Sequence, residues 1–224
     1  MKPRILLSLL LLLSLPALAG EPYFCTRPGR TLSYERTEAG SGRLRRTTTF
    51  EISAVRQGAA GREVEYLFTL RRPGGAALYG GPAKMQVEIA PDGTVRMDLG
   101  STLIAMLQNL LPRASFRSSG TQALLPPEMH PGDRLPEAHC VVEGPGMKYR
   151  IDVTEREVLR PETLTTPAGT FDCIVVREHK VERGPGRYRD TISDSWYSPG
   201  VGYVRHDTYD KNLRLETTEI LKNY

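Results

Sequence analysis

Apolar and polar residues alternate along most of this chain, in short runs that end at turns rich in glycine and proline. At residues 148–153, tyrosine, isoleucine and valine alternate with lysine, arginine and aspartate, and residues 31–39, 201–206 and 213–218 show the same period of two. The Gly-Pro-Gly sequence at residues 184–186 is typical of the turns between such runs. This pattern predicts a meander of short antiparallel strands, and therefore a mainly β fold.

One segment follows a helical period instead. From Ser101, which is expected to cap the helix, apolar residues recur at about 3.6-residue spacing until Pro112 ends the pattern. Because its polar positions are few, the helix is expected to pack on the concave side of a curved antiparallel sheet or open half-barrel. It either fills the concavity as a plug or covers a lipid-binding groove as a mobile lid. The helical side chains predicted to contact an apolar ligand are Leu103, Met106, Leu107 and Leu110.

Residues 112–136 are rich in proline, serine and glycine and predict a long, irregular crossover. We expect residues 20–224 to form a single β domain. Within it, the crossover would separate an N-terminal half (20–111) from a C-terminal half (124–224).

The strongest strand and turn signals lie in residues 163–209. Proline and glycine at residues 167–170 fit a tight turn, and residues 173–176 place apolar side chains on both faces of the next strand. Trp196 and Tyr197 end a later strand. Their side chains either line an apolar ligand site or pack at the rim of the sheet.

Three stretches carry a resemblance to a known family. They are TTPAGTFDC (165–173), WYSPGVGYVR (196–205) and, upstream, LLPPEMHPGDRLPEA (124–138). Together they resemble the TapB-like family of exported bacterial domains, whose function is unknown. The resemblance implies a curved antiparallel sheet similar to the half-barrels of the LolA and LolB lipoprotein carriers. It also implies a tetratricopeptide-repeat protein as a partner, and it brings no catalytic residues with it.

The chain has three cysteines, Cys25, Cys140 and Cys173, which allow at most one intramolecular disulfide in an oxidising compartment. Their spacing does not choose among the three pairings. The resemblance implies a Cys25–Cys173 bridge, because TapB-like sequences tend to have cysteine at both positions. A Cys140–Cys173 bridge and three buried thiols are the alternatives.

The start of the chain has the features of a secretory signal peptide. A basic start, an apolar run at residues 5–15 and an Ala-x-Ala site predict cleavage after residues 1–19. The run is shorter than the ~20 residues that span a bilayer, so we expect no integral membrane segment after cleavage. The expected location is the periplasm, the outer membrane or the outside of the cell. Without Lys2 and Arg4, 28 basic residues face 26 acidic ones, and no clustered basic face predicts nucleic-acid binding.

Motifs of common catalytic and metal sites are not found in the sequence. The four histidines, His130, His139, His179 and His206, lack metal-ligand spacing. His139 is adjacent to Cys140, but neighbouring strand residues point to opposite faces, so it is not expected to act as that thiol's base. No serine elbow or phosphate-binding loop is present either. We therefore predict no catalytic residue, no metal and no cofactor.

The predicted function is that of a non-enzymatic, exported envelope protein. It is expected to bind an apolar ligand, such as a lipid or the acyl chain of a lipoprotein, in the concavity of the sheet. The alternative is an interaction module that associates with a tetratricopeptide-repeat protein or another envelope partner. A hydrolase is a third hypothesis, and it requires a polar cluster in a cleft.

Overall fold

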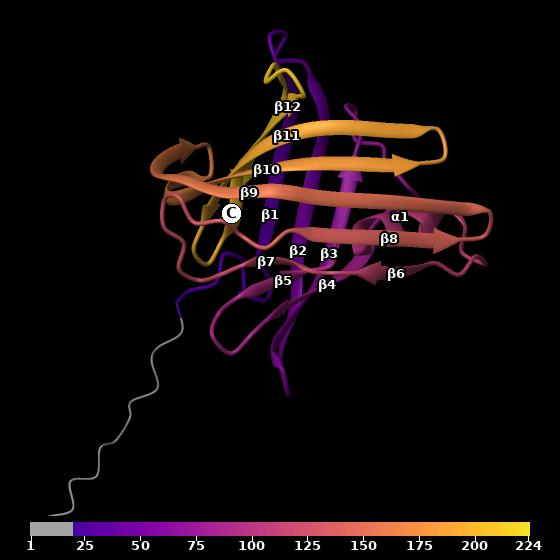
Figure 1. Cartoon of the computed structure of the whole chain (residues 1–224), viewed down its shortest axis with the longest axis horizontal. Helices are drawn as coiled ribbons and strands as arrows, with labels where there is room; N and C mark the ends of the chain where they lie inside the picture. The colour runs from indigo at the N-terminus through magenta and orange to yellow at the C-terminus, as the bar shows by residue number, and fades with distance from the viewer. Residues whose placement is uncertain (1–19) are drawn as a thin grey trace, which may run out of the picture.

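The computed structural model of the chain describes residues 20–224 (Figure 1). The predicted signal peptide, residues 1–19, lies outside the described residues. Residues 20–224 form thirteen β-strands and a single α-helix, which confirms the predicted mainly β class. In this part of the chain, no helix has the length and apolar character needed to cross a membrane.

All the strands belong to one antiparallel sheet. The strands are β1 (Thr31–Glu38), β2 (Leu44–Gly58), β3 (Gly61–Arg71), β4 (Ala83–Ile89), β5 (Val95–Met97), β6 (Arg117–Gly120), β7 (Ala123–Leu125), β8 (Ala138–Gly144), β9 (Met147–Thr166), β10 (Gly169–Gly184), β11 (Arg187–Ser198), β12 (Gly202–Asp210) and β13 (Leu215–Asn223). The helix α1 spans Ser101–Leu110, between β5 and β6. Strands on both sides of the predicted crossover therefore share one sheet.

A single segment of chain forms both edges of this sheet. The strand order is β6-β8-β9-β10-β11-β12-β13-β1-β2-β3-β4-β5-β7. The edge strands β6 and β7 are consecutive, and only Thr121 and Gln122 separate them. Strand β6 pairs with β8, and strand β7 pairs with β5. The hydrogen-bonded sheet is thus open, while the backbone itself links its two edge strands.

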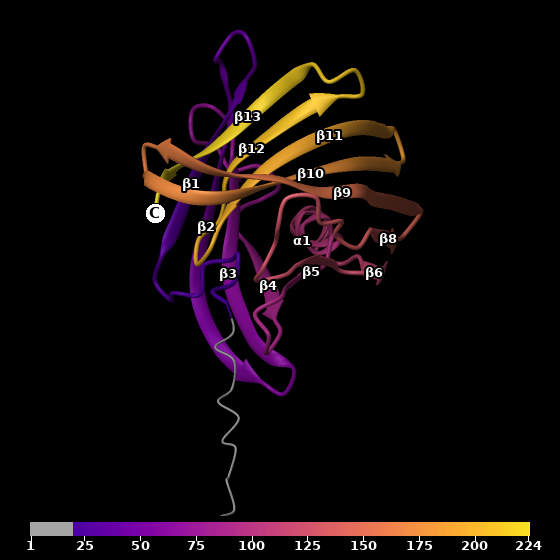
Figure 2. The same ribbon diagram turned by 60° about the vertical axis from the view of Figure 1, so that its left-hand side comes forward.

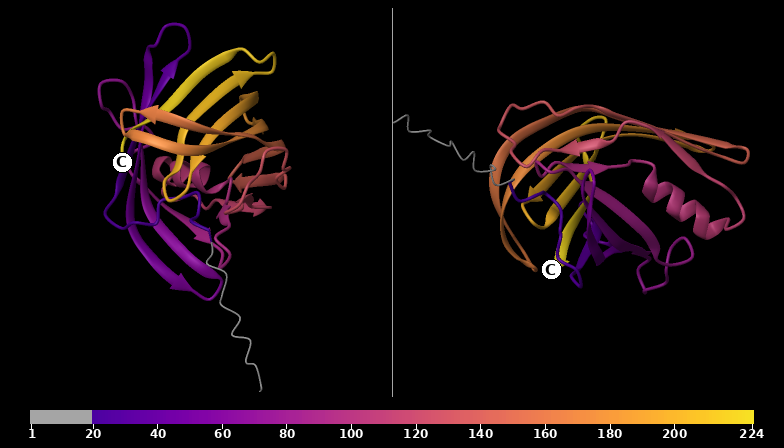
Figure 3. Two further views of the ribbon diagram at one scale, coloured as in Figure 1. Left: turned by 90° about the vertical axis from the view of Figure 1, so that its left-hand side faces the viewer. Right: turned by 90° about the horizontal axis from the view of Figure 1, so that it is seen from below.

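The sheet curves until its concave side surrounds α1, as Figures 2 and 3 show. Much of this curvature lies in the two long strands β9 and β10. Their register shifts between Val175 and Val176 and again between Arg177 and His179, and Glu155 has a left-handed backbone with φ of 50°. Such bulges bend a strand and increase its twist. The architecture is the predicted one, a curved antiparallel sheet with one helix on its concave side.

Two apolar clusters hold the fold together. The larger cluster joins both ends of the chain, because Cys25 and Tyr34 pack in it with Val204 and Leu221. It also includes residues 173–176, which are all buried, as predicted for a strand covered on both faces. The smaller cluster contains four residues of β8 and β9 and is contacted by α1; its members are Cys140, Val142, Ile151 and Val153, with Leu103, Ile104 and Leu107 packed against them.

The cysteines differ from the predicted bridge. Cys25, Cys140 and Cys173 are all free and buried, so residues 20–224 contain no Cys25–Cys173 disulfide and match the alternative of three buried thiols. The Cys173 thiol donates to the carbonyl oxygen of Phe171 at 3.5 Å. Burial raises the pKa of Cys173 to about 12 and that of Cys140 to about 11, so both stay protonated thiols.

Two local predictions also need correction. Ser101 is the first residue of α1, and the capping position belongs to Gly100, whose N–H donates to the Asp98 carboxylate at 2.8 Å. The Ser101 hydroxyl donates to the Asp98 carbonyl, also at 2.8 Å. The predicted irregular crossover contains the edge strands β6 and β7. Their three or four residues are too short to show a period, and pairing with distant strands defines them.

Candidate functional site

Helix α1 lies over the concave side of the sheet without sealing it. Although the helix is mainly apolar, none of its residues is buried. Five of them, Thr102 and the apolar Leu103, Met106, Leu107 and Leu110, line a cavity of about 630 Å³ between the helix and the sheet. We call this cavity the α1 chamber. Its volume falls in the range of about 300–1,000 Å³ that is typical of ligand sites.

The floor of the α1 chamber, which the sheet provides, is basic. Its lining includes six basic side chains: Arg36, Arg46, Arg150, Lys180, Arg187 and Arg189. Three buried hydroxyl side chains, those of Thr191, Ser193 and Thr208, are also part of it. Although burial opposes the effect, the adjacent Lys180 and Arg187 lower the pKa of Glu182 in this floor to about 2. The chamber therefore combines an apolar roof with a floor in which these charges lie beside apolar side chains of β3 and β9, namely Phe68, Leu70, Tyr149 and Ile151.

A second, smaller cavity of about 280 Å³ lies beside the chamber on the same face. Aromatic side chains dominate its lining: Tyr23, Phe24, Tyr34, Phe50, Tyr66, Tyr197 and Tyr203. The rings of Tyr34 and Tyr203 stack with their centroids 4.5 Å apart, and the Tyr34 hydroxyl donates to the Tyr203 carbonyl at 3.0 Å. Burial raises the pKa of Tyr197 to about 12. We call this cavity the aromatic pocket.

A polar row runs between the two cavities. Ser195, His206 and Glu219 lie opposite one another on the neighbouring strands β11, β12 and β13. His206 and Arg36 line both cavities. Burial, with a smaller contribution from Arg36, lowers the pKa of His206 to about 3, so its ring is neutral near pH 7.

Glu219 anchors one end of this row. Its carboxylate accepts hydrogen bonds from the Thr48 hydroxyl at 2.6 Å and from Arg36 Nε at 3.2 Å, and Arg46 Nη2 lies 3.6 Å away. Burial raises the pKa of Glu219, but Arg36 and Arg46 outweigh it, and the net shift is downward. The carboxylate is therefore ionised and fully engaged by other partners.

The other end of the row brings together a serine and a histidine. Ser195 Oγ lies 2.8 Å from His206 Nδ1, which is within the reach required of a nucleophile and its base. Ser195 is, however, buried in the middle of β11, with paired strands on both sides, and it is not exposed on a strand-to-helix turn. We interpret the row as a structural hydrogen-bond network. Ser195 and His206 lie opposite each other because the register of β11 and β12 shifts between Trp196 and Tyr197; the turn at residues 199–201 alone would place Arg205 opposite Ser195, so the sequence gives no clear signal for the row.

The amino-acid sequence of this chain matches a known protein family. Residues 27–221 match the sequence model of the DUF3108-like family. The chain belongs to the DUF3108-like family. No protein with a curated description matches it.

Two solved structures share the fold of this DUF3108-like chain. One is a protein of Bacteroides fragilis that is thought to be exported and has a YmcC-like fold; it is 22% identical, with a TM-score of 0.73 over 91% of this chain and 98% of that one. The other is a protein of Parabacteroides distasonis that is thought to be a lipoprotein; it is 23% identical, with a TM-score of 0.70 and the same coverage. At these identities the likeness shows the fold alone.

The DUF3108-like structure brings five of the six predicted ligand-binding residues to the concave face. The four helical residues line the α1 chamber, and Tyr197 lines the aromatic pocket. Trp196 is different, since it lines neither of these cavities and is only 4% exposed. The guanidinium of Arg205 covers its ring, 4.6 Å from the centroid. Neighbouring residues of a strand point to opposite faces, which explains why Tyr197 reaches the concavity and Trp196 does not.

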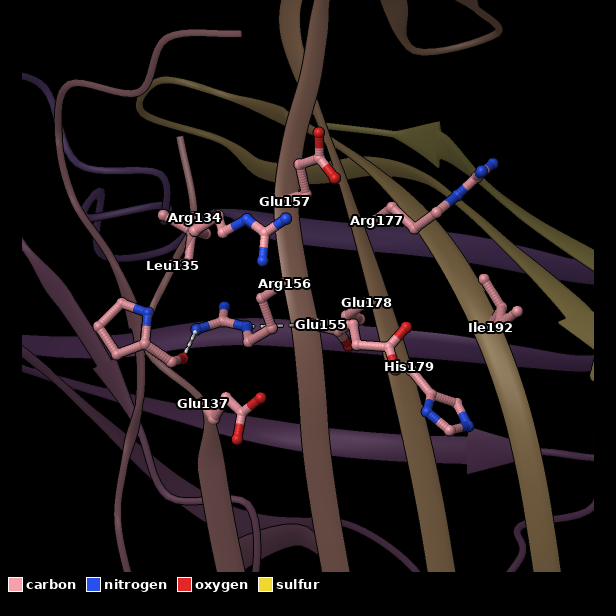
Figure 4. Close-up of a pocket in the computed structure, with 11 residues that line it drawn as sticks. Arg134, Leu135, Glu137, Glu155, Arg156, Glu157, Arg177, Glu178, His179 and Ile192 are labelled. Carbon is pink, nitrogen blue, oxygen red and sulfur yellow. Dashed lines mark hydrogen bonds and ion pairs between the residues drawn. The ribbon is translucent and has the colours of Figure 1, made fainter. Parts of the chain in front are cut away.

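A third cavity, of about 570 Å³, lies beside the bulges in the pairing of β9 with β10 (Figure 4). The buried Arg156 crosses it, and its Nη1 donates to the carbonyls of Leu124 and Pro136 at 3.1 and 2.9 Å. Its Nε lies 3.5 Å from Glu178, toward which Figure 4 shows it directed. Arg156 thus fastens β9 to β7 and to the segment before β8. We therefore interpret this polar cavity as part of the closure of the fold.

The histidines do not come together in the structure. His139 Nδ1 lies 2.9 Å from Asp152, and His179 Nε2 lies 2.7 Å from Asp190. Cys140 is buried in the smaller cluster, so it and His139 point to opposite faces of β8, as predicted. Over residues 20–224, no group of three or more histidine, cysteine, aspartate or glutamate side chains is arranged to hold a metal ion.

Proposed function

We propose that this DUF3108-like protein is a non-enzymatic envelope protein that binds the acyl chain of a lipid or a lipoprotein in the α1 chamber. The observation that carries the proposal is the open space of about 630 Å³ under a helix that buries none of its residues. A helix that served only as a plug would bury all its apolar side chains against the sheet. Here Leu103 and Leu107 pack against the smaller apolar cluster but stay half-buried, and with Met106 and Leu110 they also line the cavity, which is the arrangement expected of a lid over an apolar ligand.

The two ends of α1 are attached differently, which supports a role as a lid. At its start, Gly100 packs so closely that an added Cβ would lie 2.8 Å from both Cys140 Sγ and Ser118 Cβ. At its end, Asn109 Nδ2 makes two long hydrogen bonds of 3.4 Å, to the carbonyls of Gly81 and Pro82. We infer that the helix opens at its C-terminal end, while its start acts as the hinge.

An envelope location fits this function. The two solved relatives are thought to be an exported protein and a lipoprotein, and the predicted signal peptide would send this chain through the inner membrane. We propose that the protein works in the periplasm or at the outer membrane, where acyl chains must cross an aqueous space. In this proposal the protein would act by analogy with the LolA lipoprotein carrier.

A second candidate function is the docking of a protein partner at the mouth of the chamber. Tyr79, Leu110 and Leu111 are 41%, 53% and 46% exposed, and the first two also line the chamber. Exposed apolar side chains beside a ligand site suit a partner that delivers or receives the ligand. The narrower TapB-like resemblance would make that partner a tetratricopeptide-repeat protein. In a pull-down from periplasm, we expect the wild-type protein to recover such a partner and the Leu110→Ser variant not to.

Native mass spectrometry of protein purified from periplasm tests the acyl-chain proposal. Wild type is expected to carry a co-purified mass that is released on unfolding and identified as an acyl lipid. Leu107→Trp should lose it, because the larger ring fills the chamber. Leu111→Trp is the matched control, since Leu111 is exposed and does not line the chamber. If wild-type protein from cells with an excess of acyl lipid carried no bound lipid, the result would count against the proposal.

A further inference from the structure

The basic floor of the α1 chamber has more positive charge than its acidic partners neutralise. Arg36 and Arg46 share the single carboxylate of Glu219, at 3.0 and 3.6 Å. Lys180 and Arg187 share that of Glu182. Each of these two groups therefore has two cations for one anion. His206, between them, is held neutral and adds no charge.

Arg46 is the basic residue whose bonding capacity is least used. Its guanidinium has five N–H donors, yet its ion-pair contact is the long one to Glu219. Its Nε is buried and has no hydrogen-bond partner among the described residues. Thr208, whose side chain lines the chamber floor, offers a hydroxyl to the same space.

The Arg46 side chain is partly exposed, and an oxygen-rich anion is the ligand that best uses the free N–H donors of a guanidinium. A guanidinium fork binds phosphate in two parallel hydrogen bonds, and neighbouring hydroxyls supply further donors. The opposite wall of the same chamber is the apolar face of α1. A ligand that matches both walls has a hydrocarbon chain and a phosphate on one molecule.

From this geometry we infer that the ligand of the α1 chamber is a phosphorylated lipid, whose phosphate binds at Arg46 in the basic floor while its chain lies under α1. The inference rests on the proposed function, because it assigns the polar end of the same ligand. It turns an unspecific acyl-chain site into one that selects its ligand by charge.

A pair of lipids that differ only in the phosphate tests this assignment. The neutral dye N-phenyl-1-naphthylamine is bound first, and 1-palmitoylglycerol or its 3-phosphate, lysophosphatidic acid, then displaces it. Wild type is expected to bind the phosphate form at least about tenfold more tightly, which is the effect of one charge-assisted hydrogen bond. In Arg46→Gln, whose own dye affinity is measured first, the two lipids should displace the dye equally well. Arg56→Gln is the control, because Arg56 is exposed, pairs with Glu65 and lies outside the chamber.

The outcomes separate this inference from the function on which it rests. Equal displacement by the two lipids in wild type, or a preference that survives Arg46→Gln, overturns the phosphate site and leaves the acyl-chain function intact. If neither lipid displaces the dye, both the phosphate site and the acyl-chain function fail.

Glycerol 3-phosphate, which lacks the chain, should compete with the dye at least about a hundredfold more weakly than the lipid. Equal competition would make this a site for free phosphate esters. In wild type the preference should shrink as sodium chloride rises from about 0.05 to 0.5 M, and an unchanged preference also overturns it.

Discussion

Replacing His206 with glutamine is expected to remove much of the acid sensitivity of the fold between pH 7 and pH 5. In the folded chain, burial and the nearby Arg36 lower the pKa of His206 to about 3, from an ordinary value of 6.5. Below pH 6.5 the unfolded chain binds a proton at this residue and the folded chain does not. The free energy of unfolding therefore falls as the pH drops from 6.5 toward 3.

The size of the effect follows from this difference in pKa. At pH 5 the unfolded histidine is 1.5 pH units below its ordinary pKa, and one unit corresponds to ~1.4 kcal/mol, so the loss is about 2 kcal/mol. Since the ring is partly accessible to water, we expect about 1–2 kcal/mol. The lowered pKa values of Glu182 and Glu219 also make the free energy of unfolding fall with decreasing pH, but mainly once the pH is below the ordinary glutamate pKa of 4.5. The interval from pH 5 to pH 7 therefore isolates the histidine.

Urea unfolding at pH 5 and pH 7, followed by the fluorescence of the single tryptophan, measures this effect. His206→Gln keeps a neutral hydrogen-bonding group beside Ser195 and should show a smaller pH-dependent loss than wild type by about 1–2 kcal/mol. His130→Gln is the matched control, because the His130 side chain is 76% exposed. If wild type and His206→Gln lost the same free energy of unfolding, the histidine would not be neutral and buried, and the reasoning would be refuted.

Three further predictions concern the supports of the site. Glu219→Gln should lower the free energy of unfolding at pH 7 by about 3 kcal/mol in urea titrations, because two arginines lose a buried carboxylate. Gly100→Ala should lower the melting temperature and reduce the free energy of unfolding by about 1–3 kcal/mol, because the alanine Cβ would lie 2.8 Å from Cys140 Sγ. The three buried thiols should all react with a thiol reagent in denaturant, and only slowly in the folded protein.

Each of these predictions has a control. Glu216→Gln removes a carboxylate that is 43% exposed and should cost under about 0.5 kcal/mol; an equal loss in the two glutamate variants would contradict the role of burial. Gly58→Ala adds a Cβ whose closest neighbour would be at 3.4 Å, so it should be milder than Gly100→Ala. Fewer than three reactive thiols in denaturant without reductant would show a disulfide and contradict the free cysteines.

Local signals were enough to predict the hairpins of the C-terminal half. Around residues 163–209, proline and glycine fix the turns, and the alternation of side chains fixes the faces of the strands. The same alternation does not continue through β9, because the bulge at Glu155 shifts it. Similarly, β6 and β7 are defined by partners that lie far away in the sequence.

The site was only half predictable for a related reason. The helical period identified Leu103, Met106, Leu107 and Leu110, because the residues that form the roof of the chamber are close in sequence. The basic floor comes from strands at both ends of the chain. Arg46 and Glu219, for instance, are brought together only when β13 pairs with β1. Whether the helix filled the concavity or left it open depended on these distant side chains, and no local pattern encodes that.

The most direct test of the central claim, that the space under α1 is a binding chamber, is a fluorescence titration of the mature protein with N-phenyl-1-naphthylamine. We predict saturable binding of one dye per chain, lost in Leu107→Trp and kept in Leu111→Trp. Absence of saturable binding in wild type, or equal binding by both tryptophan variants, would contradict the account.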